Sequence, residues 1–175
     1  MSRIEFIPAD LSLHRGELLE LNVEYVSWVL AEMEKLFAVP AGEILGMPAA
    51  EYVPTVLDKL CGAPPPVGVF YLVMVDQRLA GMGGLRSLGK ANAEIKRIYC
   101  RQQFRGRGVG EQVLQRLLSD ARAFGYENAV LDSALFMRSA HRLYESAGFV
   151  DRPPYEGVEV PVEFQTRWRF MERRL

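Results

Sequence analysis

The stretch YCRQQFRGRGVGEQVLQRLL, residues 99–118, decides how this chain is interpreted. Gly106, Gly108 and Gly110 stand within five positions, between arginines, and an apolar pattern with helical spacing follows them directly. The first turn of a helix has backbone N–H groups without intrahelical partners, and the helix dipole adds positive potential there. Because glycine has no Cβ atom to hold a ligand away, this turn suits a phosphate group.

The same glycines allow four other interpretations, of which one stays open and three fit poorly. A turn that only reverses the chain, with its arginines in solvent, stays open for these residues alone. A P-loop is excluded because no Gly-Lys-Ser/Thr follows, and a dinucleotide fingerprint is excluded because Val113 stands where its third glycine belongs. An RNA-binding patch at residues 101–108 lacks support, since the net charge is −1 and no other basic segment accompanies it. We therefore expect no nucleic-acid partner.

Composition predicts one soluble globular domain over residues 1–175, with 49% hydrophobic and 25% charged residues. No apolar run approaches the roughly 20 residues of a membrane span, so no membrane partner is expected. Residues 1–10 carry charges where a signal peptide has its apolar region, which predicts a cytoplasmic protein. Cys61 and Cys100 lie far apart and outside any CxxC pair, so we expect free thiols and no metal site.

Periodicity predicts a mixed order of strands and helices. The expected strands are 3–9, 68–76, 78–88, 93–100, 128–134, 148–152 and 162–174, and the expected helices are 12–37, one from Pro48 to about Gly62, 108–124 and 138–147. A two-residue turn at Asp76 and Gln77 joins the second and third strands as a hairpin, and the fourth strand extends this antiparallel meander.

Two motifs carry a resemblance to a known family. Residues 105–110, RGRGVG, resemble the Arg/Gln-x-x-Gly-x-Gly/Ala signature of the GNAT superfamily of acyl-CoA-dependent N-acetyltransferases. Residues 140–149, AHRLYESAGF, resemble its second signature, Ala-x-x-Leu-Tyr-x-x-x-Gly-Phe, and follow in the family's order and spacing. One departure is Met137, where the family often has Asn, which leaves Arg138 and Ser139 as substitutes for a polar contact to the cofactor.

The resemblance implies an α/β fold with a mixed, mostly antiparallel central sheet, flanked by helices and split between its fourth and fifth strands. Acetyl-CoA (coenzyme A with its acetyl group) would lie in that split, with its pantetheine arm along the backbone of the fourth strand and its pyrophosphate on the glycine turn. The cofactor-binding residues implied are Ile98, Tyr99, Cys100, Arg105, Gly106, Arg107, Gly108, Val109, Gly110, Arg138 and Ser139.

Tyr144 is the candidate general acid for the departing thiolate. The resemblance implies a place beside the cofactor sulfur, and the usual tyrosine pKa of about 10 keeps the hydroxyl protonated at neutral pH. A purely structural role as a core aromatic is the alternative. Cys100 lacks a base partner that would make it a nucleophile, so direct attack by the amine is preferred.

Glu94 is the candidate general base, acting directly or through water. Strict alternation along the fourth strand places Glu94 and Lys96 on one face and Arg97 and Tyr99 on the other. Glu94 therefore has an alternative role, an ion pair with Lys96 or with a neighbouring strand. His141 is interpreted as a solvated histidine rather than a base.

The acyl acceptor is the least determined feature. The first two helices and residues 151–164 are expected to wall its pocket, Tyr155 to line it, and Arg167 with Arg169, on one face of the last strand, to hold a carboxylate. The predicted function is acetyl transfer to the primary amine of a small molecule such as an amino acid or polyamine. Alternatives are acetylation of a protein N-terminus or lysine, and a catalytically weak coenzyme A-binding regulatory module. An apolar last strand with exposed edges predicts a homodimer.

Overall fold

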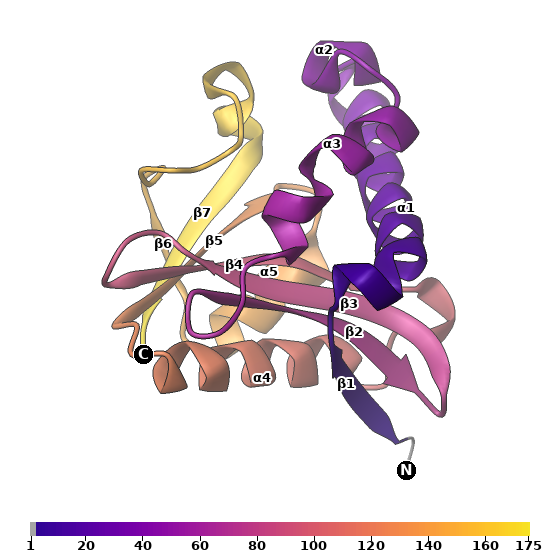
Figure 1. Cartoon of the computed structure of the whole chain (residues 1–175). Helices are drawn as coiled ribbons and strands as arrows, with labels where there is room; N and C mark the ends of the chain where they lie inside the picture. Colours follow the sequence, from indigo (N-terminus) through magenta and orange to yellow (C-terminus); the bar gives the residue numbers. More distant parts are fainter. Residues whose placement is uncertain (1–2) are drawn as a thin grey trace.

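The computed structural model describes residues 3–175, and a seven-stranded sheet forms its centre (Figure 1). The strands follow the order β1-β2-β3-β4-β5-β7-β6, and every neighbouring pair is antiparallel except β4 and β5. Their bounds are β1 Ile4–Pro8, β2 Gly68–Val75, β3 Arg78–Ser87, β4 Asn92–Cys100, β5 Asn128–Ala134, β6 Val150–Arg152 and β7 Trp168–Arg174. The predicted fold class, a mixed and mostly antiparallel sheet with flanking helices, is confirmed.

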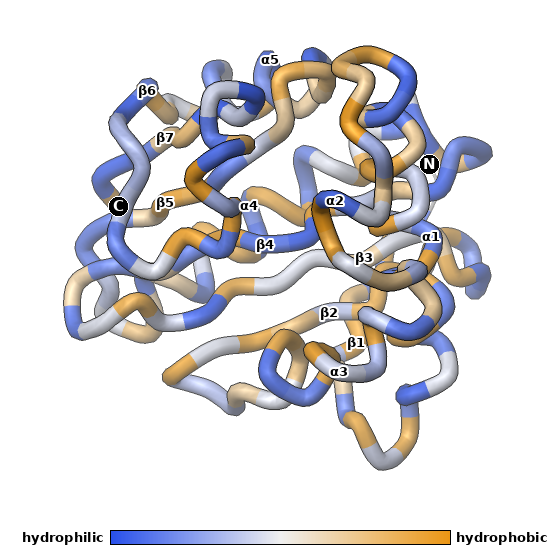
Figure 2. Tube along the Cα trace, turned by 90° about the horizontal axis from the view of Figure 1, so that it is seen from above, coloured by the Kyte–Doolittle hydropathy of each residue, from blue (hydrophilic) through white to orange (hydrophobic). Residues whose placement is uncertain are grey.

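Helices cover both faces of the sheet (Figure 1). Their bounds are α1 Leu11–Phe37, α2 Ala41–Leu45, α3 Ala49–Cys61, α4 Val109–Ala123 and α5 Arg138–Ser146, with short 3-10 helices η1 Gln102–Phe104 and η2 Val162–Arg167. One core lies between the sheet and α4, around Leu114 and Leu117, and a second lies beneath α1 and α3, around Leu21 and Leu57. Apolar segments of β2 and β5 contribute side chains to these cores, and Figure 2 colours these segments as hydrophobic.

The split in the sheet lies between β4 and β5. Their parallel pairing joins only Asn92–Glu94 to Asn128–Val130. Beyond Glu94, β4 continues to Cys100 with no further register to β5 among the described residues. This is the predicted split between the fourth and fifth strands, and it leaves one edge of β4 open along its second half.

A β-bulge interrupts the second half of β4. Met82 pairs with Tyr99 and Gly84 pairs with Lys96, so one residue of β3 between these pairs lies opposite two residues of β4. Arg97 is one of these two residues and has a φ of +58°, in the left-handed region that L-residues rarely adopt.

The bulge changes which face of the sheet Arg97 occupies. The strict alternation expected from the sequence, with Arg97 and Tyr99 opposite Glu94 and Lys96, is wrong. Arg97 lies over the ring of Tyr25 on α1 at 5.0 Å, and Tyr99 packs against the same ring. Arg97 and Lys96 also line a small cavity under α3 together. The extra residue therefore turns Arg97 onto the face that carries α1 and α3.

The C-terminal segment differs most from expectation. Residues 162–167 form η2 instead of the first half of a strand, and α2 was not predicted. Because β7 lies between β5 and β6, both of its edges are paired, so the exposed-edge argument for a homodimer is wrong and oligomeric state stays a prediction. The remaining elements match within a few residues, and Asp76 and Gln77 form the expected hairpin turn with φ of 49° and 63°.

Two further predictions concern membranes and thiols. Within residues 3–175, no helix combines the length and the apolar character that crossing a membrane requires. Cys61 and Cys100 are free thiols, as the sequence predicts.

Candidate functional site

A cleft of about 830 Å³ opens where β4 and β5 separate. We divide it into two parts that are used below. The glycine half is lined by Ile98–Cys100, by Phe104–Gly106 with Gly108–Gly110, and by Ser133 and Phe136–Tyr144 in part. The aromatic half is lined by α1, α2 and α3 through Tyr25, Val29, Ile44, Leu45 and Tyr52, by Lys96, Arg97 and Asp132, and by Glu159–Pro161, Phe164 and Trp168.

The glycine half has the features of an anion cradle. Gly106 and Gly108 have φ of 75° and 74°, and a Cβ atom built at either would meet no atom within 4 Å. Gly108 is also the N-cap of α4, and as a glycine it offers no side chain to cap the N–H groups of the first turn. These residues fit a pyrophosphate, because glycine conformation, open volume and unpaired N–H groups coincide at one point.

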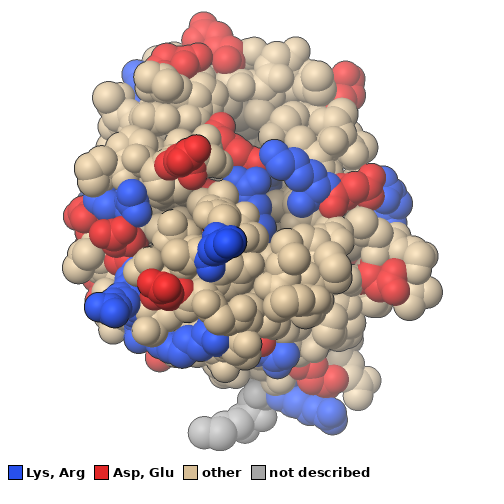
Figure 3. Space-filling view, turned by 60° about the vertical axis from the view of Figure 1, so that its left-hand side comes forward, with Lys and Arg blue, Asp and Glu red and all other residues tan. Residues whose placement is uncertain are grey.

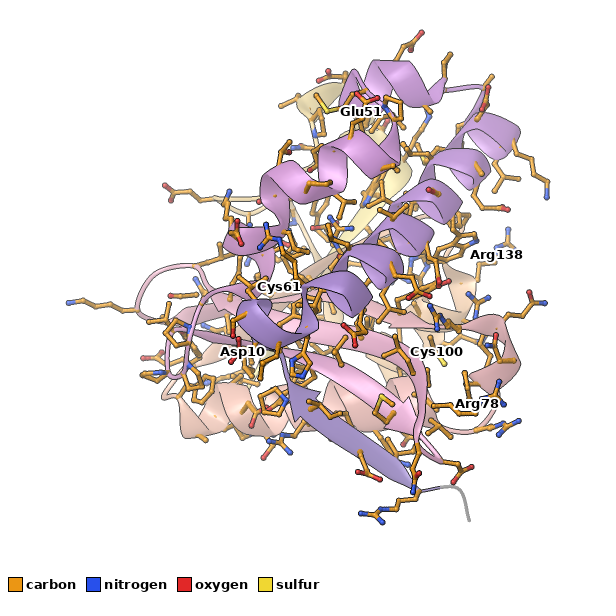
Figure 4. All side chains as sticks on the ribbon, turned by 45° about the vertical axis from the view of Figure 1, so that its right-hand side comes forward. Asp10, Glu51, Cys61, Arg78, Cys100 and Arg138 are labelled. Atoms are coloured by element: carbon orange, nitrogen blue, oxygen red, sulfur yellow. The ribbon has the colours of Figure 1, made fainter. Side chains whose placement is uncertain are left out.

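Arginines flank this cradle. Arg105 donates from Nε to the carbonyl of Cys100 at 2.9 Å and stacks over Trp28 at 5.5 Å. Arg107 lies over Phe104 at 5.8 Å and is exposed. Cys100 and Arg138 lie on the same side of the molecule, toward the glycine half (Figure 4). The predicted cofactor-binding residues are thus brought together, apart from Arg107, which does not line the cleft.

Tyr144 lies on α5, is 7% exposed and lines the cleft. Its ring packs against Phe149 at a centroid distance of 5.9 Å. Burial raises the pKa of Tyr144, and the nearby groups Tyr25 and Asp132 act in the same direction, so its hydroxyl remains protonated far above neutral pH. Tyr144 is therefore a core aromatic and a wall of the cleft at once.

Glu94 is fully buried and is held by three partners. Arg86 donates from Nε to one carboxylate oxygen, and Tyr155 donates from Oη to the other at 2.8 Å. Lys96 approaches within 3.7 Å, so the ion pair left open by the sequence is present. Glu94 is not among the residues that line the cleft. Its role as the base stays a prediction.

Asp132 and Glu159 are the carboxylates that line the cleft, and the sequence does not single out Asp132 as a site residue. Asp132 accepts a hydrogen bond from Tyr155 Oη at 3.3 Å. Burial raises the pKa of Asp132 to about 6, with Glu94 acting in the same direction and Lys96 opposing it. The available signal was a lone acid inside the apolar strand NAVLDSA, residues 128–134.

Three expectations about side chains need correction. His141 is buried rather than solvated, and burial lowers its pKa. Arg167 ends η2 and lies over Phe37, whereas Arg169 on β7 pairs with acidic groups outside the cleft. Neither arginine lines the cleft, so they do not share a carboxylate site there. Tyr155 lies behind the wall, where it joins Glu94 to Asp132.

Trp28 separates the two halves. Its indole packs against Tyr99 at 6.3 Å and edge-on against Phe136 at 5.4 Å, so it reaches from β4 to the segment before α5. Outside the cleft, Lys and Arg are interspersed with Asp and Glu on the face drawn in Figure 3, without a large area of one sign. A basic surface for nucleic acid is absent from that face.

Comparison with known proteins identifies relatives. Residues 30–149 match the sequence model of the Acetyltransferase (GNAT) family. The chain is 35% identical over 101 residues to an uncharacterized N-acetyltransferase, YsnE, of Bacillus subtilis, covering 57% of this chain and 65% of that protein. It is 31% identical over 86 residues to N-acetylaspartate synthetase of Rattus norvegicus, covering 49% of this chain and 29% of that protein. The chain thus spans less than two thirds of either relative.

Solved structures share the fold across nearly the whole chain. The PaiA N-acetyltransferase of Thermoplasma acidophilum, solved in complex with coenzyme A, superimposes with a TM-score of 0.70 at 15% identity, covering 99% of both chains. A GNAT-family acetyltransferase of Staphylococcus aureus superimposes with a TM-score of 0.71 at 18% identity, also covering 99% of both chains. At these identities the likeness concerns the fold.

Proposed function

The chain belongs to the GNAT acetyltransferase family, and on this premise we propose that it transfers an acetyl group from acetyl-CoA to the primary amine of a small molecule. One observation carries the proposal. The open, positive-φ glycine turn, the free edge of β4 and the side chains of Tyr144 and Asp132 all border one cleft. The proposal keeps a single domain over residues 1–175 and a cytoplasmic location as predictions from the sequence.

Cofactor binding is assigned to the glycine half. The amides of residues 106–110 would hold the pyrophosphate, with Arg105 and Arg107 adding positive charge, and Arg138 and Ser139 bordering the same region. The backbone of Ile98–Cys100 would take the pantetheine arm as an additional strand, because that edge of β4 has no register to β5. Acetyl-CoA, when bound, supplies the acetyl group as a thioester.

Asp132 is proposed to accept the proton that the amine nitrogen loses as the new N–C bond forms. With a pKa of about 6, its carboxylate is ionised at neutral pH but more basic than an ordinary aspartate. Glu94 is proposed as a positioning residue, because its hydrogen bond to Tyr155 fixes the hydroxyl that also contacts Asp132. The predicted base role of Glu94 is tested against this arrangement below.

Tyr144 is proposed to donate its Oη proton to the departing sulfur as the C–S bond breaks. Its raised pKa keeps the proton available over the whole working range of pH, and it faces the same cleft as Asp132. Tyr144 is buried, which limits access of water to its hydroxyl, whereas Asp132 is half-buried on the wall of the cleft.

A small-molecule acceptor is favoured by the lining of the aromatic half, to which α1, α2 and residues 159–168 all contribute side chains. The rat relative is named for an acetylated amino acid, N-acetylaspartate, and this name supports free amino acids as candidate acceptors. A protein N-terminus or lysine is the second candidate, and a coenzyme A-binding module without turnover is the third.

An amine screen with detection of released thiol tests the proposal. The panel contains free amino acids, polyamines and a peptide with a free N-terminus and a lysine. We expect turnover of at least one free small molecule that depends on acetyl-CoA. Turnover of the peptide alone would contradict the small-molecule assignment, and tight coenzyme A binding with no turnover of any amine would support the regulatory module instead.

A further inference from the structure

Arg97 is the unneutralised charge of the aromatic half. Lys96 and Glu159 form an ion pair with each other, and Asp132 is hydrogen-bonded to Tyr155. Within residues 3–175, the side chain of Arg97 has no ion pair and no hydrogen bond, although it lines the cleft. The acidic groups of this half are thus already engaged by other partners, which leaves one positive charge without an anion.

The guanidinium of Arg97 is also partly buried. Its Nη1 is inaccessible to solvent and has no partner among the described residues. The aromatic face of Tyr25, at 5.0 Å, stabilises the charge but accepts no hydrogen bond in the plane of the guanidinium. Leaving a buried donor of a charged group unsatisfied is costly, and native proteins rarely do so without a reason.

The backbone conformation of Arg97 is a second energetically unfavourable feature of this residue. A non-glycine residue with φ of +58° is strained, and such strain persists where function requires it. Without the extra residue of the bulge, the alternation of β4 would direct Arg97 to the face of α4, away from α1. Strain, burial and an unpaired charge therefore coincide on one side chain that faces the cleft.

We infer that Arg97 binds the carboxylate of the acceptor and that the acceptor is an amino acid with an apolar side chain. This inference rests on the proposed acetyl transfer and specifies its substrate class. A guanidinium presents a planar fork of donors that matches a carboxylate, which would satisfy Nη1. Beside the charged Lys96, Asp132 and Glu159, the aromatic half is lined by the apolar and aromatic side chains Tyr25, Val29, Ile44, Leu45, Tyr52 and Phe164.

The same charge disfavours the other acceptors. A polyamine carries several positive charges and no carboxylate, so Arg97 would repel it. The side chain of a lysine within a protein brings no carboxylate near its amine. An acidic amino acid would place a second carboxylate against an apolar wall that offers it no partner, since Lys96 is held by Glu159.

The first experiment compares two acceptors that differ in one group, L-phenylalanine and phenethylamine, at saturating acetyl-CoA. Removing one partner of a buried charged pair typically costs a factor of about 100 or more. We therefore expect kcat/KM for L-phenylalanine to exceed that for phenethylamine by about 100-fold, mostly through KM. L-aspartate and spermidine should be poor acceptors.

The second experiment changes the arginine. Arg97→Gln should lower kcat/KM for L-phenylalanine by about 100-fold and leave that for phenethylamine within about three-fold, which erases the preference. Arg97→Lys, which keeps the charge but not the fork, should restore part of it. Arg167→Gln is the matched control, because this arginine lies over Phe37 outside the cleft and should change neither value.

The outcomes separate this inference from the proposed function. Wild-type affinity for acetyl-CoA, measured by calorimetry in each variant, shows that the fold and the glycine half are intact. Equal wild-type turnover of both amines, no turnover of any amino acid, or an equal loss on both amines in Arg97→Gln overturns the inference. Failure of the wild type to bind acetyl-CoA overturns the proposed function itself.

Discussion

The two halves of the cleft are built in different ways. The glycine half presents backbone: amides at the start of α4, the free edge of β4 and two glycines with positive φ. The aromatic half presents side chains from α1, α2, α3 and residues 159–168, which lie far apart in the sequence. A backbone site needs a few glycines at fixed spacing, whereas a side-chain site needs whole segments to pack together.

This difference indicates how the cleft divides its work. The glycine half is suited to one ligand, because amides and a helix dipole recognise phosphate without regard to side chains. The aromatic half is suited to selectivity, because its wall depends on residues such as Arg97 and Tyr52 that can differ without disturbing the glycine turn. Substitutions in the two halves should therefore have separable effects on cofactor affinity and on acceptor choice.

The largest effect is expected for Gly108→Asp in the glycine half. The change places a carboxylate where a phosphate is proposed to bind, and like charges at an interface cost several kcal/mol, so acetyl-CoA affinity should fall on the order of 10³-fold by calorimetry. Gly125→Asp is the matched control, since Gly125 ends the same helix region with φ of +88° and open space. Equal losses of affinity in both variants would mean that backbone strain, not phosphate binding, is responsible.

Asp132→Asn tests the proposed base, which lines the aromatic half. It should lower kcat several hundred-fold at pH 7.5, within the range typical of general-base removal, with acetyl-CoA affinity retained. In the wild type, the rate should fall as pH drops through about 6, the pKa of Asp132, and this acidic limb should be absent from the variant.

Linkage gives a second readout for Asp132 that does not need activity. Folding raises the pKa of this carboxyl from 3.8 to about 6, so ionisation destabilises the folded state. The wild type should therefore lose stability relative to Asp132→Asn as pH rises from about 4 to about 6, measured by thermal unfolding at pH 4 and pH 7. A stability difference that is independent of pH would refute the raised pKa.

Glu94→Gln sharpens the same assignment. Because Glu94 is buried and paired with Arg86, its replacement should lower the free energy of unfolding by about 3–5 kcal/mol. The acidic limb should remain, since Asp132 remains, but it should move below pH 6, because the Glu94 charge that helps to raise the pKa of Asp132 is lost. A limb that disappears in Glu94→Gln and stays in Asp132→Asn would return the base role to Glu94, as the sequence predicts.

Tyr144→Phe is expected to lower kcat about 100-fold, at the lower end for loss of a general acid, because a thiolate leaves more readily than an alkoxide. Affinity for acetyl-CoA should stay within about three-fold and unfolding should change little, since the ring and its packing on Phe149 are kept. Full turnover in this variant would leave Tyr144 with its structural role alone.

The smallest effect is expected at Arg101, which joins the end of β4 to α1 and does not line the cleft. Arg101 follows β4 and donates from Nε to Glu24 on α1 at 3.0 Å, with Glu20 as a further partner. Arg101→Gln should cost about 1 kcal/mol of unfolding free energy and raise the acceptor KM a few-fold, with acetyl-CoA affinity unchanged. A larger effect on acetyl-CoA than on the acceptor would contradict the division of the cleft.

The sequence predicted the glycine half well because its information is local. Gly106, Gly108 and Gly110 fix the turn, and the helix pattern directly after them fixes α4. Tyr144 was identified from a motif on one helix and lines the cleft, and its role as the acid stays a prediction.

The aromatic half was predicted poorly because its information is not local. One extra residue in β4 reverses the face of Arg97, and no pattern within β4 marks the bulge. Alternating apolar letters over residues 162–167 suggested a strand, yet Phe164 is buried in a 3-10 helix. The pKa of Asp132 is raised by burial and by Glu94, and both effects come from residues distant in sequence.

Calorimetric titration with acetyl-CoA, beside ATP and NAD as controls, tests the central claim most directly. We expect the wild type and Gly125→Asp each to bind one acetyl-CoA per chain saturably, and Gly108→Asp to bind it much more weakly. Neither ATP nor NAD should bind the wild type with comparable affinity. Absence of acetyl-CoA binding, or equal affinity for all three nucleotides, would contradict the assignment of the cleft to acetyl transfer.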